Sequence, residues 1–206
     1  MERRSTSTPS AQGEADRSES DLLAKARGGN LFAFEEIVKR YQRRVYGVAY
    51  RIVRRHDVAD DVAQEAFIRA YQALERFDPG RPFGPWIFRI AANLAVNHVR
   101  SPEARESSLP EGHAETPSAA PDPLGGLLER ESREVLDAAL ASLPAGQRAV
   151  LVLRAVEGLS YREIAEGLGI SQGTVMSRLF RARERLATAL SPYLGAAARQ
   201  ARGDGA

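Results

Sequence analysis

The sequence predicts an all-α protein made of two small helical domains joined by a flexible linker, with a helix-turn-helix in the C-terminal domain. Apolar residues recur at steps of three and four over residues 21–100 and again over residues 127–191, which is the period of helices that bury one face. The segment between them, residues 101–126, is rich in Pro, Ser, Ala and acidic side chains, as flexible linkers are. No alternating strand pattern occurs in the sequence.

The composition excludes several classes of protein. Hydrophobic residues make up 43% and charged residues 27% of the chain, and no apolar run is long enough to span a membrane, so no membrane insertion is expected. Cysteine is absent, which excludes disulfides and thiolate metal sites and favours a cytoplasmic location. Residues 1–20 and 192–206 are predicted to be tails; the first has hardly any large apolar residue and no signal-peptide pattern.

The N-terminal domain, residues 21–100, is predicted to contain three helices. The first has an apolar stripe at helical spacing, made of Phe34, Ile37, Tyr41, Val45, Val48 and Ile52. After a break at residues 55–57, a second stripe follows, made of Ala63, Phe67, Ala70 and Leu74. The stretch FDPGRPFGP, Phe77 to Pro85, holds three prolines and two glycines and predicts a loop. A third helix is expected from near Trp86 to Val99.

The C-terminal domain, residues 127–191, begins with a helical pattern that ends at Leu143 and Pro144. Three short helical units are predicted after it, over residues 147–157, 160–168 and 171–190. The last two, with the turn between them, have the layout of a helix-turn-helix.

Local signals support this layout. Ser160 is expected to cap the first of the two helices, with Glu163 completing a capping box three residues later. Gly169 suits the tight turn, and Ser171 is expected to cap the second helix.

The second helix of this motif has a buried side and a polar side. Val175, Leu179, Ala182 and Leu186 form the apolar stripe. The other side, with a net charge of +3 over residues 171–186, is predicted to bind DNA through Ser171, Gln172, Thr174, Met176, Ser177, Arg178, Phe180, Arg181 and Arg183. Gln and Arg can bind adenine and guanine edges in the major groove, and Arg also binds phosphates. The alternative is a helical hairpin that packs on a neighbour and binds nothing.

Charge is distributed in blocks along the chain. The net charge of +2 is the balance of +5 over residues 21–100, −6 over residues 101–142, +4 over residues 145–206 and −1 over residues 1–20. Two basic blocks indicate two surfaces that could meet a polyanion. The alternative is that these charged faces are merely solvated.

Two blocks of sequence together resemble the sigma-70 family of transcription initiation factors. LPAGQRAVLVLRAVEGLSYREIAEGLGI, Leu143 to Ile170, with GISQGTVMSRLFRAR after it, resembles region 4 of that family. DVADDVAQEAFIRAYQALERFDP, Asp57 to Pro79, is similar to the part of region 2 that docks on core RNA polymerase, and RPFGPWIFRIAANLAVNHVR, Arg81 to Arg100, to the part that reads and melts the −10 element. The short linker leaves no room for the third sigma domain, a reduction typical of the extracytoplasmic-function (ECF) group.

The resemblance implies roles for particular residues in region 2. Asp61, Gln64 and Glu65 are expected to bind the clamp helices of the largest polymerase subunit. Their alternative role is a solvated face in which Glu65 pairs with Arg69. The expected −10 residues, which would hold unpaired bases, are Phe83, Trp86, Arg89, Asn93, Asn97 and Arg100. Phe83 and Trp86 have a packing alternative, because such aromatic residues often belong to the core of a small domain.

The sequence departs from the family pattern in three places. Pro85 stands where a Thr or Gly commonly precedes the Trp, and Ala92 stands where Arg often precedes the Asn. The family's GTVKSRL is GTVMSRL here, so that Met176 and Phe180 make an apolar pair on the expected DNA face. We hypothesise that the pair contacts thymine methyl groups in the −35 element. The alternative is that Phe180 folds back onto its own domain.

The resulting prediction is an ECF-type sigma factor whose partners are core RNA polymerase, promoter DNA and an anti-sigma factor. No catalysis, cofactor or metal is expected, since His56, His98 and His113 are scattered and no phosphate-cradling or nucleophile motif occurs. An activator or a recombinase with a similar helix-turn-helix would need a strand-containing domain ahead of it. Because the linker is flexible, the free chain is expected to be compact only when a partner holds both halves.

Overall fold

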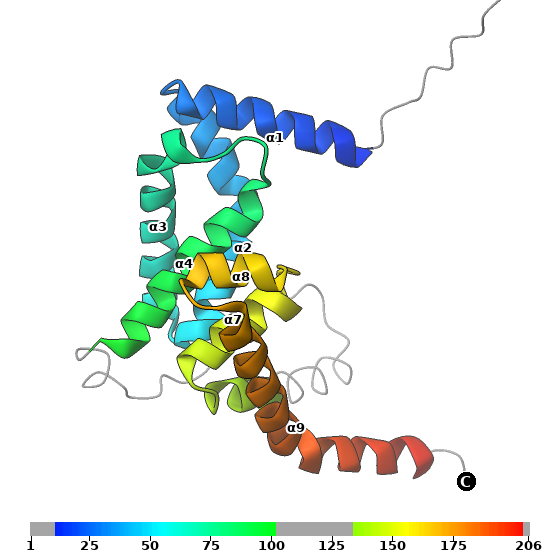
Figure 1. Cartoon of the computed structure of the whole chain (residues 1–206). Coiled ribbons are helices and arrows are strands. Elements are labelled where there is room, and N and C mark those ends of the chain that lie inside the picture. Colours follow the sequence, from blue (N-terminus) through cyan, green and yellow to red (C-terminus); the bar gives the residue numbers. More distant parts are fainter. Residues whose placement is uncertain (1–10, 102–133, 204–206) are drawn as a thin grey trace, which may run out of the picture.

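The computed structural model describes residues 11–101 and 134–203, and within these ranges every regular element is a helix (Figure 1). The elements of the N-terminal domain are α1 (Ala11–Arg27), α2 (Leu31–Val53), α3 (His56–Gln72), the 3₁₀ turn η1 (Leu74–Arg76) and α4 (Phe83–Arg100). Those of the C-terminal domain are a helical segment over residues 134–141, α7 (Ala145–Ala155), α8 (Tyr161–Leu168) and α9 (Gln172–Gly203). The all-α prediction is confirmed for the described residues. The predicted linker and the outermost parts of both tails lie outside them.

The central helix of the N-terminal domain is α2, which packs against α1, α3 and α4. Its predicted stripe is buried except for the half-buried Tyr41, with Ile37, Val45 and Ile52 fully enclosed. The helix begins at Asn30, whose side-chain oxygen accepts a hydrogen bond from the backbone N–H of Ala33 at 3.1 Å. It ends at Arg54, which adopts the left-handed conformation that glycine usually supplies (φ 64°).

The helix-turn-helix has the local structure that the sequence predicted. The hydroxyl of Ser160 accepts from the N–H of Glu163, and the carboxylate of Glu163 accepts from the N–H of Ser160, which is a complete capping box. Gly169 ends α8 with φ 62°, as its place in the tight turn requires. The Ser171 hydroxyl caps α9 by accepting from the N–H of Thr174 at 3.1 Å. Val175 is fully buried on the inner side of α9.

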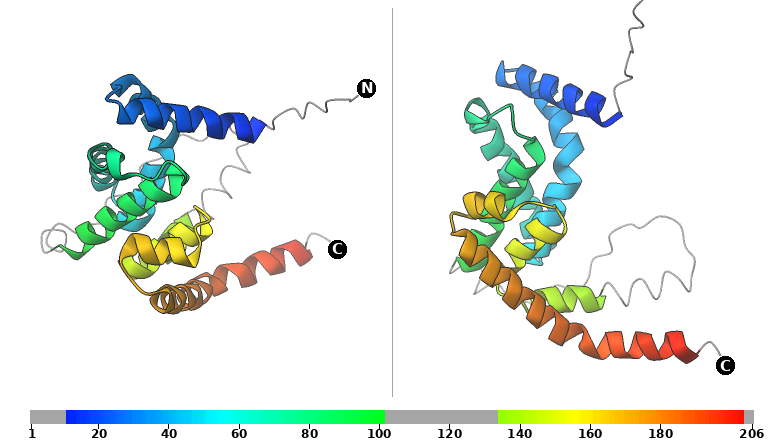
Figure 2. Two further views of the ribbon diagram at one scale, coloured as in Figure 1. Left: turned by 45° about the horizontal axis from the view of Figure 1, so that its top comes forward. Right: turned by 45° about the vertical axis from the view of Figure 1, so that its right-hand side comes forward.

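Three helix boundaries differ from the prediction. The N-terminal domain has one helix more than the three predicted: α1 precedes the predicted first helix and reaches back to Ala11, so part of the expected tail is helical. It is tied to α2 by a 2.7 Å hydrogen bond from the Tyr41 hydroxyl to Glu19. The helix α4 begins at Phe83 rather than near Trp86, because Pro85 falls in the first turn, where a missing N–H costs nothing. The last helix continues through Pro192, with a bend in its second half (Figures 1 and 2).

The two domains pack on each other, which the sequence did not predict. The C-terminal helices α7 and α8 lie against α2 and α4 (Figure 2). One cluster of buried apolar residues runs through both domains without a break, from Leu23 in α1 to Leu179 in α9. The chain alone therefore forms a compact body, although the flexible linker led us to expect compaction only with a partner. No helix in the described ranges has the length and apolarity needed to cross a membrane.

Candidate nucleic-acid and polymerase interfaces

The outer side of α3 carries the residues expected to bind polymerase. Asp61 and Gln64 are exposed, and Glu65 is half-buried, with its carboxylate 2.6 Å from the guanidinium of Arg69. The ion pair between Glu65 and Arg69, which was the alternative to polymerase binding, is therefore present. Asp61 and Gln64 remain accessible beside it. Beside this acidic row lies Ile68, an apolar side chain that is 52% exposed. The sequence interpretation missed Ile68, although its position four residues after Gln64 places it on the same face.

The exposed surface of α3 is separate from the main contact between the two domains. The helix packs on α2, α4 and η1, all of which belong to the N-terminal domain. Tyr71 extends the apolar part of this surface, and its ring lies 5.0 Å from that of Phe34. A row of acidic and amide groups next to exposed apolar side chains is a composition that suits a protein partner.

The polar residues of α4 form a line that changes from half-buried to exposed. Arg89 and Asn93 are half-buried, whereas Asn97 and Arg100, one and two turns further on, are exposed. Their spacing of three and four residues places all four along one side of the helix. The opposite side is apolar and packs into the N-terminal core, where Ile87 is fully enclosed.

The aromatic residues of the loop and of the start of α4 form a cluster in the core. Phe83 has no exposed surface, and its ring packs edge-on against Tyr41 at 5.3 Å and against Phe77 at 5.7 Å. Trp86 is partly buried, 4.8 Å from Phe77 and 5.5 Å from Phe83. Phe83 is therefore a core residue, which was the alternative to its holding an unpaired base. The ring of Trp86 lies at the edge of the cluster, between core and surface.

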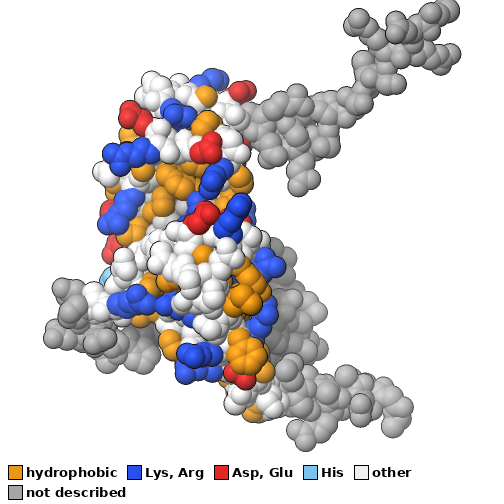
Figure 3. Space-filling view, in the orientation of Figure 1, with side chains coloured by type: hydrophobic (Ala, Val, Ile, Leu, Met, Phe, Trp, Pro, Cys, Tyr) orange, Lys and Arg blue, Asp and Glu red, His pale blue; other side chains and the backbone are white. Residues whose placement is uncertain are grey.

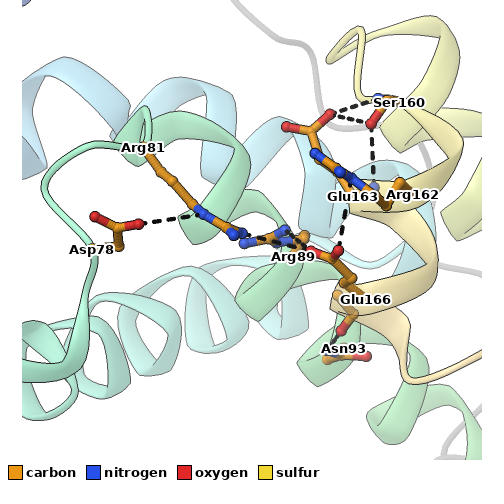
Figure 4. Close-up of polar contacts among 9 residues, drawn as sticks. Asp78, Arg81, Arg89, Asn93, Ser160, Arg162, Glu163 and Glu166 are labelled. Carbon is orange, nitrogen blue, oxygen red and sulfur yellow. Dashed lines mark hydrogen bonds and ion pairs between the residues drawn. The ribbon is translucent and has the colours of Figure 1, made fainter.

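The half-buried residues of α4 are in contact with the end of α8 (Figure 4). The side-chain amide of Asn93 donates a hydrogen bond to the backbone carbonyl of Gly167. The carboxylate of Glu166 lies 4.0 Å from the guanidinium of Arg89 and 3.6 Å from that of Arg81, which belongs to the loop before α4. Burial lowers the pKa of Arg89, while Glu166 and Glu163 act to raise it.

The polar side of α9 is largely exposed. Gln172, Ser177, Arg181 and Arg183 face outward, and Thr174 and Arg178 are half-buried. Arg178 lies over the start of α7, where a Cβ added at Gly146 would come 3.2 Å from its guanidinium. Basic and apolar side chains lie intermixed on the face of the molecule that carries α7, α8 and α9 (Figure 3).

The apolar pair on α9 is also exposed. Met176 is 56% exposed and Phe180 62% exposed. Phe180 therefore does not fold back onto its own domain, which was the alternative to the methyl-contact hypothesis. Exposed apolar side chains among arginines cost hydration free energy unless a partner covers them.

A further contact between the domains, away from the expected −10 residues, is the hydrogen bond from Arg148 to Ile52 of α2; the other two hydrogen bonds of Arg148 lie within the C-terminal domain. Arg148 of α7 is buried and donates to the carbonyl oxygens of Ile52 at 2.6 Å, Leu143 at 2.7 Å and Ala141 at 3.2 Å. Burial and, secondly, the charge of Arg54 lower its pKa to about 10, so that the guanidinium stays charged at neutral pH.

Two ion pairs complete the contact between the domains. Arg54 at the end of α2 pairs with Asp137 at 2.8 Å, and Arg44 of α2 pairs with Glu157 at 2.8 Å. The guanidinium of Arg44 also lies over the ring of Phe88 at 4.6 Å, so that it links α2, α4 and the end of α7.

No group of three or more His, Asp or Glu side chains in the part of the chain that the structure describes is placed to hold a metal ion. The described faces instead offer arginines, amides and hydroxyls at helix surfaces, which is the chemistry of phosphate and base-edge contacts.

Comparisons with known proteins match both domains. Residues 37–105 match the family model of Sigma-70 region 2, and residues 133–186 match that of Sigma-70 region 4. The sequence is 38% identical to the RNA polymerase sigma-H factor of Pseudomonas aeruginosa, over 84% of this chain and 94% of that protein. It is 36% identical, with the same shares covered, to the ECF RNA polymerase sigma-E factor of Escherichia coli K12. The sigma factor RpoE of Bartonella quintana, solved in complex with the anti-sigma factor NepR, has a similar structure: the TM-score is 0.60 at 26% identity, covering 77% of this chain and 96% of that one.

Proposed function

Because the chain belongs to the ECF group of the sigma-70 family of transcription initiation factors, we propose that α3 binds core RNA polymerase while α4 and α9 bind promoter DNA. The observation that carries this assignment is the separation of the three surfaces. An acidic and apolar face lies on α3, a line of arginine and amide groups on α4, and a basic face on α9. Promoter recognition by two domains requires such separate faces.

On α3, Asp61, Gln64 and Glu65 supply the polar contacts to polymerase. We add Ile68 to this set, because its exposed apolar side chain lies beside them and polymerase would remove it from water. Arg69 orients the carboxylate of Glu65 through their ion pair.

On α4 and the loop before it, unpaired bases of the −10 element are held by Arg89, Asn93, Asn97 and Arg100. The amides can bind base edges, and the arginines can bind phosphates or stack on bases. Phe83 acts indirectly, because its buried ring fixes the loop and the start of α4. Trp86, at the edge of the same cluster, offers the ring on which an unstacked base can rest.

On α9, the −35 element is read in the major groove. Gln172, Thr174 and Ser177 face base edges, and Arg178, Arg181 and Arg183 neutralise phosphates. Ser171 positions the helix through its cap. Met176 and Phe180, exposed one turn apart on this side, contact thymine methyl groups.

We also propose where the chain acts and what kind of protein regulates it. The chain acts in the cytoplasm, where the transcription machinery of bacteria is found, and it performs no catalysis of its own. An anti-sigma factor that covers the polymerase and DNA faces is its expected regulator, by analogy with the Bartonella quintana relative solved with such a partner.

Transcription in a purified system tests this function. Bacterial core RNA polymerase, a library of random promoter templates and this chain as the single initiation factor should give specific start sites, whereas core polymerase alone should give none. An activator would need a separate sigma factor, so a lack of specific starts without one would overturn the proposal. The transcripts recovered also define the −35 and −10 sequences.

A charge reversal locates the polymerase contact. Asp61→Lys should abolish complex formation with core polymerase without weakening binding of the free chain to −35 duplex DNA. The matched control is Glu36→Lys, which reverses an exposed acid on α2. Equal polymerase binding by both variants would remove α3 from the proposal.

A further inference from the structure

We infer that α1 fixes the position of the loop between η1 and α4, residues 78–82 (the −10 loop), and that Glu19 and Tyr41 are therefore positioning residues for base selection at the −10 element. The inference rests on the proposed function, in which this loop and α4 hold unpaired −10 bases. It adds residues outside α4 to those that decide which −10 sequence the chain selects.

The −10 loop is exposed along its whole length, but the residues at its two ends are buried. Residues 78–82 are open to solvent, whereas Phe77 and Phe83 belong to the core. Within the loop, the carboxylate of Asp78 pairs with the guanidinium of Arg81 at 3.5 Å (Figure 4). Such a local contact shapes the loop, but it does not fix where the loop lies on the domain. That position depends on what holds the two ends.

The backbone just ahead of the loop is held by the last turn of α1. The guanidinium of Arg27 donates a hydrogen bond to the backbone carbonyl of Glu75 in η1 at 3.1 Å. Leu23 of α1 and Leu74 of η1 are both buried, as expected where two helices pack. The helix α1 lies at the same end of the N-terminal domain as the loop (Figures 1 and 2).

The far end of the loop is held by Tyr41 of α2. Its ring packs edge-on against Phe83 at 5.3 Å and against Phe88 at 6.0 Å. The ring also lies on the backbone of α4, because a Cβ added at Gly84 would come 3.1 Å from Cε1 of Tyr41. The glycine allows this close approach. A shift of the Tyr41 ring would therefore move the first turn of α4 and the end of the loop with it.

Glu19 of α1 sets the orientation of the Tyr41 ring. The Tyr41 hydroxyl donates a hydrogen bond to the Glu19 carboxylate at 2.7 Å, and both side chains are half-buried. Burial, and then the bond to Glu19, raises the pKa of Tyr41 well above its usual value, so that the hydroxyl remains a donor at neutral pH. A hydrogen bond to a charged acceptor is stronger than one between neutral groups. The helix α1 thus holds both ends of the −10 loop, one through Arg27 and the other through Tyr41.

Base selection depends on the position of the loop. A site for an extruded base must be formed beforehand, because extrusion itself costs free energy. Trp86, 4.8 Å from Phe77 and 5.5 Å from Phe83, belongs to the same aromatic cluster and would move with it. Displaced loop ends would therefore carry the base-contacting groups away from the base, while α3 and α9 keep theirs. The expected loss is in discrimination between −10 bases, and binding of polymerase and of −35 DNA should persist.

The first test measures −10 discrimination by holoenzymes. Core polymerase is combined with the unchanged chain, with Tyr41→Phe or with Glu19→Leu, and initiation is measured from promoters in which each −10 base is changed in turn. Tyr41→Phe keeps the ring and removes only the hydroxyl. Each variant should reduce the preference at one −10 position by roughly fivefold, the factor that one lost hydrogen bond produces. The double variant should lose no more than either single one, because both changes remove the same bond.

Two further variants serve as controls. Glu19→Gln keeps an oxygen that can accept from Tyr41, and it should retain most of the −10 preference. Tyr46→Phe removes another hydroxyl from α2, one that is hydrogen-bonded to His56 at the start of α3, and it should change neither the −10 nor the −35 preference. If Tyr41→Phe lowers initiation from all −10 variants alike, or changes the −35 preference as well, Tyr41 merely stabilises the domain and the inference is wrong.

A second measurement follows the loop in the free chain and needs no polymerase. Trp86 is the only tryptophan of the sequence, so its fluorescence reports on the aromatic cluster at the ends of the loop. Tyr41→Phe and Glu19→Leu should shift its emission to longer wavelength and increase its quenching by acrylamide, whereas Tyr46→Phe should alter neither. Emission and quenching that stay the same in all three variants would overturn the link from α1 to the loop.

Failure of this inference is distinct from failure of the proposed function. If the unchanged chain initiates with a −10 preference that Tyr41→Phe and Glu19→Leu both keep, α1 does not position the loop and the function stands. If the unchanged chain initiates nowhere with core polymerase, the proposed function is wrong and the inference falls with it.

Discussion

The polar side chains of the two proposed DNA faces differ in whether they have protein partners in the free chain. On α4, the guanidinium of Arg89 and the amide of Asn93 are half-buried and have partners on α8. On α9, Arg181 and Arg183 are exposed to water. A partly buried polar group costs free energy unless it is hydrogen-bonded, whereas an exposed arginine needs no protein partner.

The difference follows from the form of DNA that each face is proposed to bind, which is a melted strand for α4 and a duplex for α9. A melted strand presents base edges and ring faces, which must be held in a site shielded from water, and such a site can also be filled by the chain itself. A duplex presents phosphates at its surface, which solvated arginines attract over a longer range. The half-buried residues of α4 therefore suit a melted strand, and the exposed arginines of α9 suit a duplex.

The largest effect is expected from Arg148, the buried arginine of α7 that donates to Ile52 of α2. Arg148→Met would leave the carbonyls of Ile52, Leu143 and Ala141 without this donor. Because an unsatisfied buried polar group costs about 1–3 kcal/mol, the free energy of unfolding should fall by about 3 kcal/mol or more. Urea unfolding measures this change.

The control for Arg148 is Arg154→Met on the same helix. Arg154 donates to a single carbonyl, that of Leu159 at 2.9 Å, and is exposed. Its loss should cost about 1 kcal/mol. If both variants lose the same stability, Arg148 does not anchor the domains, and the contrast between the two faces loses its structural basis.

The next largest effect is expected on DNA binding by the exposed arginines of α9. Arg181→Ala and Arg183→Ala should each weaken binding of the free chain to −35 duplex by about tenfold and reduce the slope of log affinity against log salt by about one. Arg43→Ala, an exposed arginine of α2, is the control and should change neither value. An unchanged salt slope in both variants would show that Arg181 and Arg183 do not meet phosphates.

Short-range features of the fold were predictable from the sequence. The capping box of Ser160 and Glu163, the left-handed Gly169 and the buried stripe of α9 were all found, because each depends on residues within one or two turns. The family was also identified correctly, since its two motifs are short and lie in the expected order. Arg54 shows the limit of such rules, because an arginine ends α2 in the conformation usually given to glycine.

The contact between the domains could not be predicted in this way. Arg148 and Ile52 are 96 residues apart in sequence, and no periodicity links them. Gly167 looks like an ordinary weak point in a short helix until Arg89 is placed beside it. Phe83 illustrates the same problem, because an aromatic residue next to a loop fits both a core and a strand-binding role, and only packing separates the two.

A smaller effect is expected at the apolar pair of α9. If Met176 contacts a thymine methyl, Met176→Lys should reduce the preference for thymine at one step of the −35 element by roughly fivefold. This factor corresponds to the free energy of one small apolar contact. Met176→Leu keeps the apolar surface and should keep the preference. Promoter selection with each holoenzyme measures it, and an unchanged preference in Met176→Lys would refute the contact.

The smallest effect is a pH dependence at the start of α8, the helix that packs on α4. Hydrogen bonds from the hydroxyl and the N–H of Ser160 lower the pKa of Glu163 below its usual 4.5. Stabilisation by this carboxylate is therefore fully present above pH 4.5 and is lost as the pH falls through its lowered pKa. Glu163→Gln should cost about 1 kcal/mol or less at pH 7, and urea unfolding should show the difference from the unchanged chain shrinking at acid pH. A difference that stays constant from pH 7 to pH 3 would show that the charge of Glu163 does not stabilise the helix.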